Sequence, residues 1–239
     1  MDFTPRVIVI TVDAAVAGGK TTLIGRLADE LCFPVEICSE PVEAWQHSGL
    51  LEEMYAGLEY QRAHPGQPDP NGMPGMFQIY AFSTRLGQFV PAMRRAQQRS
   101  AAEKTPVILL CERSIWSDRA IFKHMLVAAG HITSVQERVY DGCFEAWELV
   151  ADTTRPDLAV WLDTAVDDCL VRYHQRARDG ETLTRDYATA LDARHREVFG
   201  AGEFQGAPVL RLDGSAAFHK DRDALQRLAA EINKAVMKL

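Results

Sequence analysis

A run of apolar residues at positions 6–12, RVIVITV, is the feature that most limits how this chain can fold. Apolar and polar side chains do not alternate along it, so a strand built from this run must be buried on both faces. Similar runs lie at residues 107–111, 158–162 and 209–212, with a weaker one at 35–38. Helical segments separate the runs, and this alternation predicts an α/β fold with a parallel sheet covered by helices on both sides.

The helices that we expect lie at residues 21–32, 77–98, 164–178, 184–199 and 221–238, with one or two more within 115–150. The segment 57–75 is rich in Gly, Pro, Gln and Asn, which predicts a surface loop. A length of 239 residues is enough for one sizeable core. We therefore predict a single domain over residues 1–239.

Composition and charge exclude several classes of protein. The chain is 47% hydrophobic and carries a formal net charge of −7, which argues against a protein that binds a nucleic-acid polymer. No apolar run is long enough to span a bilayer, and the first residues lack the pattern of a signal peptide. The five cysteines form no CxxC pair, and Cys38 and Cys111 lie in or beside apolar runs, so buried thiols and a cytoplasmic location are expected.

The segment DAAVAGGKTT, residues 13–22, follows the first strand and opens a helix. In that context backbone N–H groups and the helix N-terminus attract phosphate oxygens, Lys20 adds a positive charge, and the Thr21 hydroxyl can bind Mg²⁺. Ala14 stands where such loops usually have glycine, at a cost of about 1 kcal/mol if the position needs a positive φ. The predicted nucleotide-binding residues are Ala15, Val16, Ala17, Gly18, Gly19, Lys20, Thr21 and Thr22.

Three further motifs follow along the chain. They are SEPVEAW at residues 39–45, CERSIWSDR at 111–119, and a helix with arginines at positions 172, 176 and 178. In this order the set resembles the deoxyribonucleoside kinase family over roughly residues 6–220. The resemblance implies a P-loop kinase fold with a five-stranded parallel sheet, ATP as phosphate donor with Mg²⁺, and a homodimer. It also implies feedback inhibition by a deoxynucleoside triphosphate.

The same resemblance assigns the catalytic roles. Glu40 is implied to be the general base for the 5′-hydroxyl of a deoxyribonucleoside, and Arg113 to hold the 5′-oxygen together with Glu40. Glu112 is implied to bind Mg²⁺ with Thr21, whereas Glu43 matches no catalytic position. The arginine-rich segment at about 172–186 is implied to be a lid whose side chains contact the ATP phosphates, through Arg172, Arg176 and Arg178.

The nucleoside pocket is expected around the helix that begins near Phe77. Gln78 and Arg85 are seven residues apart and so share one helix face. By resemblance, Arg85 and Asp118 form the pair that favours deoxycytidine or a deoxypurine nucleoside over thymidine. Tyr55 and Glu181 are implied to hold the 3′-hydroxyl. The other positions implied to line the pocket are Val42, Trp45, Met54, Phe77, Ala81 and Phe122.

Two alternatives use the same fold. One is a nucleoside monophosphate kinase of the thymidylate kinase type, which needs extra positive charge for the acceptor phosphate, where this chain has Glu40. The other is a non-catalytic nucleotide-binding protein, which predicts loss of the site arginines. Glu40, Arg113 and Arg176 are all present, and this favours the nucleoside kinase.

Overall fold

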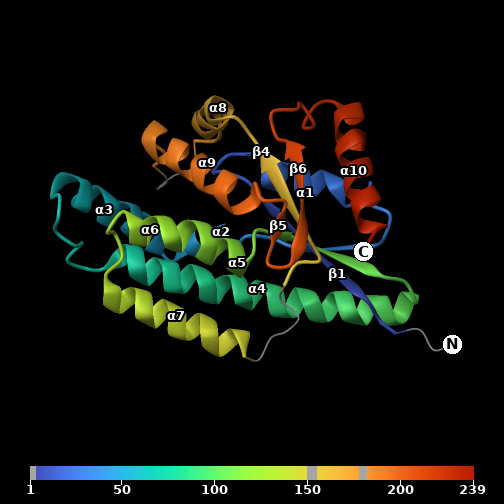
Figure 1. The fold of residues 1–239 in the computed structure, drawn as a ribbon, viewed down its shortest axis with the longest axis horizontal. Coiled ribbons are helices and arrows are strands. Elements are labelled where there is room, and N and C mark those ends of the chain that lie inside the picture. The colour runs from blue at the N-terminus through green and yellow to red at the C-terminus, as the bar shows by residue number, and fades with distance from the viewer. Residues whose placement is uncertain (1–3, 150–154, 178–181) are drawn as a thin grey trace.

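The centre of the fold is a six-stranded sheet in the order β2-β3-β1-β4-β6-β5. Figure 1 shows helices above and below this sheet in the view. The computed structural model describes residues 4–149, 155–177 and 182–239. Five strands run parallel, as predicted, and the two-residue strand β5 adds an antiparallel edge beside β6. The strands are β1 (Val7–Asp13), β2 (Val35–Cys38), β3 (Val107–Glu112), β4 (Leu158–Asp163), β5 (Glu203–Phe204) and β6 (Ala207–Asp213).

Helices precede or follow each of the parallel strands. The first half of the chain contains α1 (Lys20–Leu27), α2 (Val42–His47), α3 (Leu50–Ala63) and α4 (Met73–Glu103). After β3 come α5 (Ile115–Ser117), the π-helical turn η1 (Asp118–Lys123), α6 (His124–Ala128) and α7 (Ser134–Glu148). The last helices are α8 (Val166–Arg176), α9 (Arg185–Phe199) and α10 (Arg222–Val236).

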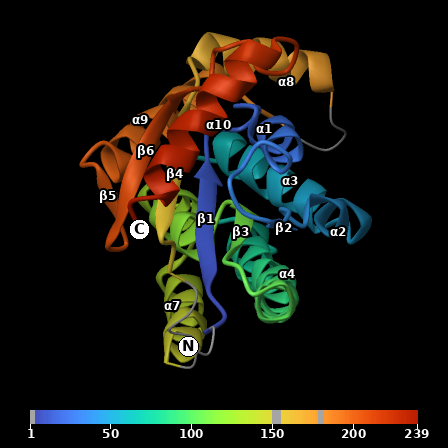
Figure 2. The same cartoon turned by 90° about the vertical axis from the view of Figure 1, so that its right-hand side faces the viewer.

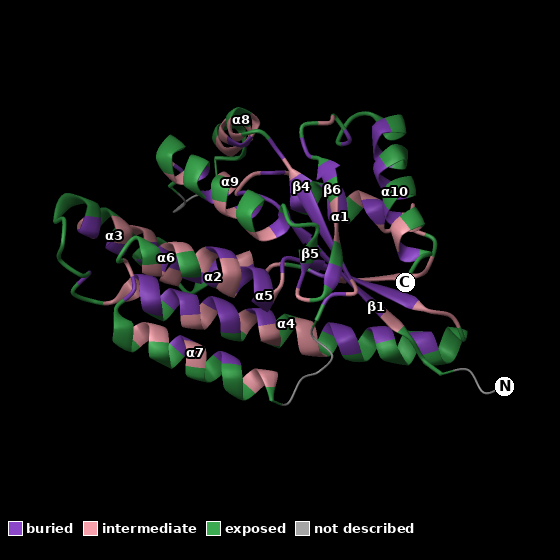
Figure 3. Cartoon of the chain, viewed as in Figure 1, coloured by how far each residue is buried: buried purple, intermediate pink, exposed green. Residues whose placement is uncertain are grey.

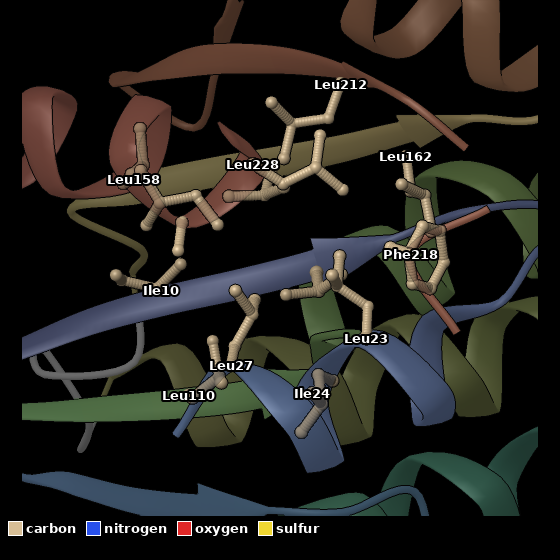
Figure 4. Packing of buried hydrophobic residues seen from close by; sticks show 14 of the residues in the cluster. Ile10, Leu23, Ile24, Leu27, Leu110, Leu158, Leu162, Leu212, Phe218 and Leu228 are labelled. Atoms are coloured by element: carbon tan, nitrogen blue, oxygen red, sulfur yellow. The ribbon is translucent and has the colours of Figure 1, made fainter. Parts of the chain in front are cut away.

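The sheet is covered on both faces, as the lack of alternation in its strands predicts (Figures 2 and 3). On one face, Ile8 and Ile10 of β1 pack with Leu23 and Leu27 of α1 and with Leu228 of α10 (Figure 4). On the other face, side chains of β1 and β3 pack against the long helix α4. Successive residues of β1 therefore contribute to two different cores, and both cores are apolar.

The parallel arrangement brings three strand ends to one edge of the sheet. β1 is the central strand, β3 pairs with it in register, and β2 pairs with β3. Ligands of open α/β sheets bind beyond the carboxyl ends of the strands, where the order of strands reverses. The phosphate loop after β1, Glu40 after β2 and Glu112 at the end of β3 meet at this edge.

The predicted loop at 57–75 is wrong at both ends. α3 continues to Ala63 and α4 begins at Met73, which leaves a loop of residues 64–72. Gly57 lies inside α3, and a Cβ there would come within 2.9 Å of Pro74 and 3.0 Å of the Asp69 carboxylate. The missing side chain of Gly57 therefore lets α3 pack closely against Asp69 and Pro74, and this glycine does not mark a turn.

Other expected helix boundaries also shift. α1 ends at Leu27, five residues before the predicted end at Cys32. α4 runs over 31 residues and continues through Pro91, beyond the predicted 77–98. None of the helices in the described part of the chain combines the length and the apolar character that a membrane span needs.

Candidate active site

The loop between β1 and α1 is shaped by close backbone approach. A Cβ at Gly18 would lie 2.8 Å from the Ala14 Cβ and 2.9 Å from the Ala15 carbonyl oxygen, so glycine is required there. The loop residues with positive φ are Ala17 and Gly19, at 59° and 97°. Ala14 is not among them, and its buried side chain joins the apolar core, so alanine causes no backbone strain at this position.

Lys20 is the first residue of α1 and lies almost completely buried at the base of the loop. Its Nζ is 3.5 Å from the Ala15 carbonyl oxygen. Burial, together with the positive charge of Arg113, lowers the pKa of Lys20 to about 8 despite the nearby carboxylates. A phosphate bound in the loop would favour the charged amine, because it supplies the missing negative charge.

Glu40 lies two residues after β2, where its carboxylate is held by arginines from two other elements. Nη2 of Arg85, on α4, donates to Oε1 of Glu40 at 2.5 Å. Nε of Arg113, directly after β3, is 3.3 Å from the same oxygen. Burial opposes ionisation, but the charges of Arg85, Arg113 and Lys20 outweigh it and lower the pKa of Glu40 to about 2. The carboxylate is therefore ionised at neutral pH.

Arg113 has a strained backbone at this point. Its φ is 63°, in the left-handed region, while its backbone N–H still donates to the Val12 carbonyl at 3.0 Å. Its guanidinium lies over the Phe122 ring at 4.5 Å and has Nη1 3.8 Å from the fully buried carboxylate of Asp13. Strain of this kind persists only where the surrounding structure fixes it, and it is common at functional sites.

A metal-compatible pair joins the phosphate loop to β3. The Thr21 hydroxyl donates to Oε1 of Glu112 at 2.6 Å. A hydroxyl beside a carboxylate provides the hard oxygen ligands that Mg²⁺ prefers, and Mg²⁺ commonly uses one or two protein ligands plus phosphate oxygens. The described residues contain no cluster of three or more acidic, His or Cys side chains for a metal, so a bound Mg²⁺ would rely on the nucleotide.

The predicted base pocket contains a buried carboxylate with several partners. Asp118, at the start of η1, accepts at Oδ2 from Gln78 Nε2 at 2.6 Å and from the Tyr140 hydroxyl at 2.9 Å. Its Oδ1 is 3.4 Å from Nε of Arg85. Burial raises the pKa of Asp118, and these hydrogen bonds and the charge of Arg85 act in the opposite direction. Sequence reasoning missed Tyr140, because its place on an apolar face of α7 looks like ordinary core packing.

The aromatic residues of the pocket also contact one another. The rings of Trp45 and Phe77 meet edge to face at 5.5 Å, and the Arg85 guanidinium lies over the Trp45 ring at 5.0 Å. The indole N–H of Trp45 donates to the Thr84 hydroxyl at 2.8 Å. These contacts fix the apolar wall of the pocket before any ligand is bound.

The predicted lid is described in part. Arg172 on α8 donates from Nη1 to the Gly18 carbonyl at 3.3 Å, so the lid helix contacts the phosphate loop. Arg176 lines the same cavity. Arg178 and Glu181 lie outside the described residues.

One cavity of about 1390 Å³ joins the phosphate loop to the base pocket. Ala15 does not line it, and contributes to the loop through its carbonyl oxygen, which accepts from the N–H of Gly18. Asp168, His219 and Lys220 also line the cavity and were not predicted. The predicted residues that line it are Val16, Ala17, Gly18, Gly19, Lys20, Thr21, Thr22, Glu40, Val42, Trp45, Met54, Tyr55, Phe77, Gln78, Ala81, Arg85, Glu112, Arg113, Asp118, Phe122, Arg172 and Arg176.

Comparison with known proteins finds relatives that match nearly the whole chain. A family model described as deoxynucleoside kinase matches residues 10–237. A probable deoxycytidine kinase of fowlpox virus is 27% identical over 234 residues, covering 96% of this chain and 88% of the viral protein. The deoxyadenosine/deoxycytidine kinase of Bacillus subtilis is 27% identical over 209 residues, 87% of this chain and 83% of the bacterial protein. Human mitochondrial thymidine kinase 2 is 28% identical over 217 residues, 90% of this chain and 72% of the human protein.

Proposed function

The chain belongs to the deoxynucleoside kinase family, and from this premise we propose that it transfers the γ-phosphoryl group of ATP to the 5′-hydroxyl of a deoxyribonucleoside. Family membership makes it a transferase that phosphorylates a nucleoside. The proposal adds the donor, the acceptor atom and the residues that act on them.

The observation that carries the proposal is the carboxylate of Glu40, which Arg85 and Arg113 contact in the same cavity as the phosphate loop. A carboxylate at the acceptor site can accept the proton of a hydroxyl, as a general base does. It would repel the phosphate of a nucleoside monophosphate. The charge of Glu40 therefore favours a nucleoside as acceptor over the substrate of a thymidylate kinase.

The remaining charged groups fit phosphoryl transfer. Lys20 and the backbone N–H groups of the loop would bind the ATP phosphates. Arg113, which contacts Glu40, would hold the 5′-oxygen beside its base. Arg172, which already contacts Gly18, would offset charge on the transferred group together with Arg176 and Arg178. Thr21 and Glu112 would hold Mg²⁺, which when bound offsets the charge of the phosphate oxygens.

The base that we propose is cytosine or a purine, and not thymine. Asp118 can accept from an exocyclic amino group, and Arg85 beside it is a donor at the same edge. Thymine would present a carbonyl to the carboxylate, and its methyl group would need the space of Arg85. Tyr55, which lines the cavity, and Glu181 are proposed to hold the 3′-hydroxyl.

Two further proposals follow from the same site and its surroundings. A deoxynucleoside triphosphate would inhibit by feedback, because the cavity is continuous from the base pocket to the phosphate loop.

A homodimer would cover exposed apolar side chains on α4 and α7, namely Met76, Val135 and Val139.

The direct test supplies the purified protein with ATP, Mg²⁺ and each of the four deoxyribonucleosides in turn, and separates the products by chromatography. We expect 5′-monophosphates, formed fastest from deoxycytidine, deoxyadenosine or deoxyguanosine. Phosphorylation of deoxynucleoside monophosphates but of none of the nucleosides would overturn the proposal.

A further inference from the structure

The guanidinium of Arg85 links Glu40, the proposed general base, to Asp118 in the pocket that is proposed to bind the nucleobase. Arg85 donates from Nη2 to Glu40 at 2.5 Å and has Nε 3.4 Å from Asp118. Different nitrogen atoms of one rigid planar group therefore face two carboxylates. Arg85 is itself only 8% exposed and stacks on Trp45, so bulk water screens neither contact strongly.

Asp118 is fixed on the side away from Arg85. Both hydrogen bonds from Gln78 and Tyr140 fall on Oδ2, whereas Arg85 faces Oδ1. The Tyr140 donor comes from α7 and the Gln78 donor from α4, so two helices hold this carboxylate in place. Arg85 makes the longest of the three contacts with Asp118. A ligand that binds at this carboxylate would therefore move Arg85 before it moved Gln78 or Tyr140.

Glu40 is held through one oxygen by both of its arginines. Arg85 and Arg113 each contact Oε1, and Arg113 is itself fixed by its backbone and by the Phe122 ring. Rotation of the Arg85 guanidinium toward Asp118 would lengthen its bond to Glu40, because the same planar group makes both contacts. The proton acceptor and the base pocket are thus connected by a single movable group.

We propose that Arg85 is a positioning residue for Glu40, so that recognition of the nucleobase at Asp118 sets the orientation and basicity of the carboxylate that accepts the 5′-hydroxyl proton. The inference rests on the proposed function of Glu40. It assigns to Arg85 an effect on the reacting end of the nucleoside, in addition to its contact with the base.

The consequence is that discrimination between bases appears in kcat as well as in KM. A base that completes the hydrogen bonds of Asp118 leaves Arg85 in the position that orients Glu40. A base that does not match draws Arg85 away and displaces the carboxylate. A displacement of about 1 Å at a reacting group can cost on the order of 100-fold in rate.

The first experiment measures the protonation of Glu40 without turnover. ¹³C NMR of the protein labelled at Glu side chains would follow the Glu40 carboxyl over pH, with Glu40→Gln to assign its signal. We expect the midpoint to rise by about 1–3 pH units in Arg85→Met, because a neighbouring guanidinium lowers a carboxylate pKa by that amount. Among the described residues, the other charged groups that act on or respond to Glu40 include Lys20, Arg113 and Asp118, and all three are unchanged in this variant.

Two variants serve as controls in the same titration. Arg85→Lys keeps the positive charge and should leave the midpoint close to that of the unchanged protein. Arg95→Met removes an exposed arginine of the same helix, which pairs with Glu36, and should leave the midpoint unchanged. An unshifted Glu40 midpoint in a folded Arg85→Met variant would overturn the inference.

The second experiment compares kcat for the four deoxyribonucleosides. In the unchanged protein the preferred and the poorest base should differ in kcat by roughly tenfold or more. In Arg85→Lys, which cannot bridge two carboxylates through a planar group, this difference in kcat should shrink while a difference in KM remains. Discrimination confined to KM in the unchanged protein would contradict the coupling. Absence of turnover with every nucleoside would contradict the proposed function instead, and the NMR titration would still be interpretable.

Discussion

The Thr21 hydroxyl donates to Oε1 of Glu112 at 2.6 Å, which joins the first turn of α1 to the end of β3 across the edge of the sheet. The two residues are 91 positions apart in the chain. This contact brings together the two oxygen groups that we propose for Mg²⁺.

We predict that Glu112→Gln raises the Mg²⁺ concentration for half-maximal activity by about 10–100-fold, the usual cost of losing a supporting metal contact. An amide oxygen is a weaker ligand for Mg²⁺ than a carboxylate. Initial rates measured against Mg²⁺ at fixed ATP would check this. Glu36→Gln, a carboxylate on β2 that pairs with Arg95, is the matched control. An unchanged Mg²⁺ dependence in Glu112→Gln would argue against the metal role.

Replacing the general base should remove turnover and leave the fold intact. Glu40→Gln keeps the shape of the side chain but cannot accept a proton, so kcat should fall by ~10²–10⁴-fold. Steady-state kinetics together with circular dichroism would measure both effects. Glu43→Gln changes an exposed carboxylate three residues away and should retain activity. Near-normal turnover by Glu40→Gln would remove Glu40 from the mechanism.

The pKa of Lys20 predicts a proton uptake on ATP binding. Because burial and the charge of Arg113 lower this pKa to about 8, the amine loses its proton as pH rises above that value. ATP phosphates favour the charged form, so binding at pH 9 should take up protons, and affinity should fall with rising pH. Calorimetry in two buffers of different ionisation enthalpy would count the protons. Lys20→Ala should abolish the uptake while partly retaining nucleoside binding, and equal loss of both affinities would contradict a role restricted to phosphate.

Specificity should change when the Arg85–Asp118 pair is removed as a unit. The double variant Arg85→Met/Asp118→Ala should raise thymidine activity relative to deoxycytidine, since an unpaired buried polar group costs roughly 1–3 kcal/mol, or about 10–100-fold in kcat/KM. Each single variant should do worse, because it leaves the other charge buried without its partner. Competition assays with both nucleosides would measure the ratio. A double variant with no gain would show that another part of the pocket excludes thymidine.

The exposed apolar side chains of α4 and α7 predict association. Light scattering at micromolar concentration should give twice the mass of one chain. Val139→Glu would place a charge on this surface, where Val139 is 49% exposed, and should shift the protein to monomer without unfolding it. A monomeric mass for the unchanged protein would refute the homodimer.

The sequence alone determined the parallel sheet and the phosphate loop. The five runs became β1, β2, β3, β4 and β6. β1, β3 and β4 are buried along nearly their whole length, because strands without alternation can be stable only when both faces are covered. The phosphate loop was predictable because its glycines, Lys20 and Thr21 stand at fixed spacing between a strand and a helix. Each has a local role, in close backbone approach, in phosphate binding or in Mg²⁺ binding. The predicted loop at 57–75 is wrong because Gly57 serves packing within a helix, which composition cannot distinguish from a turn.

Only the tertiary structure showed that Arg85 also reaches Glu40 and that Tyr140 reaches Asp118. Arg85 and Glu40 are 45 residues apart, and Tyr140 and Asp118 are 22 apart, yet each pair is hydrogen-bonded. Periodicity places Arg85 and Gln78 on one face of a helix, but it does not say which strand end that face meets. That choice depends on the packing of α4 against β2 and β3, where many weak apolar contacts fix the position of the helix and so bring its arginine to the catalytic carboxylate.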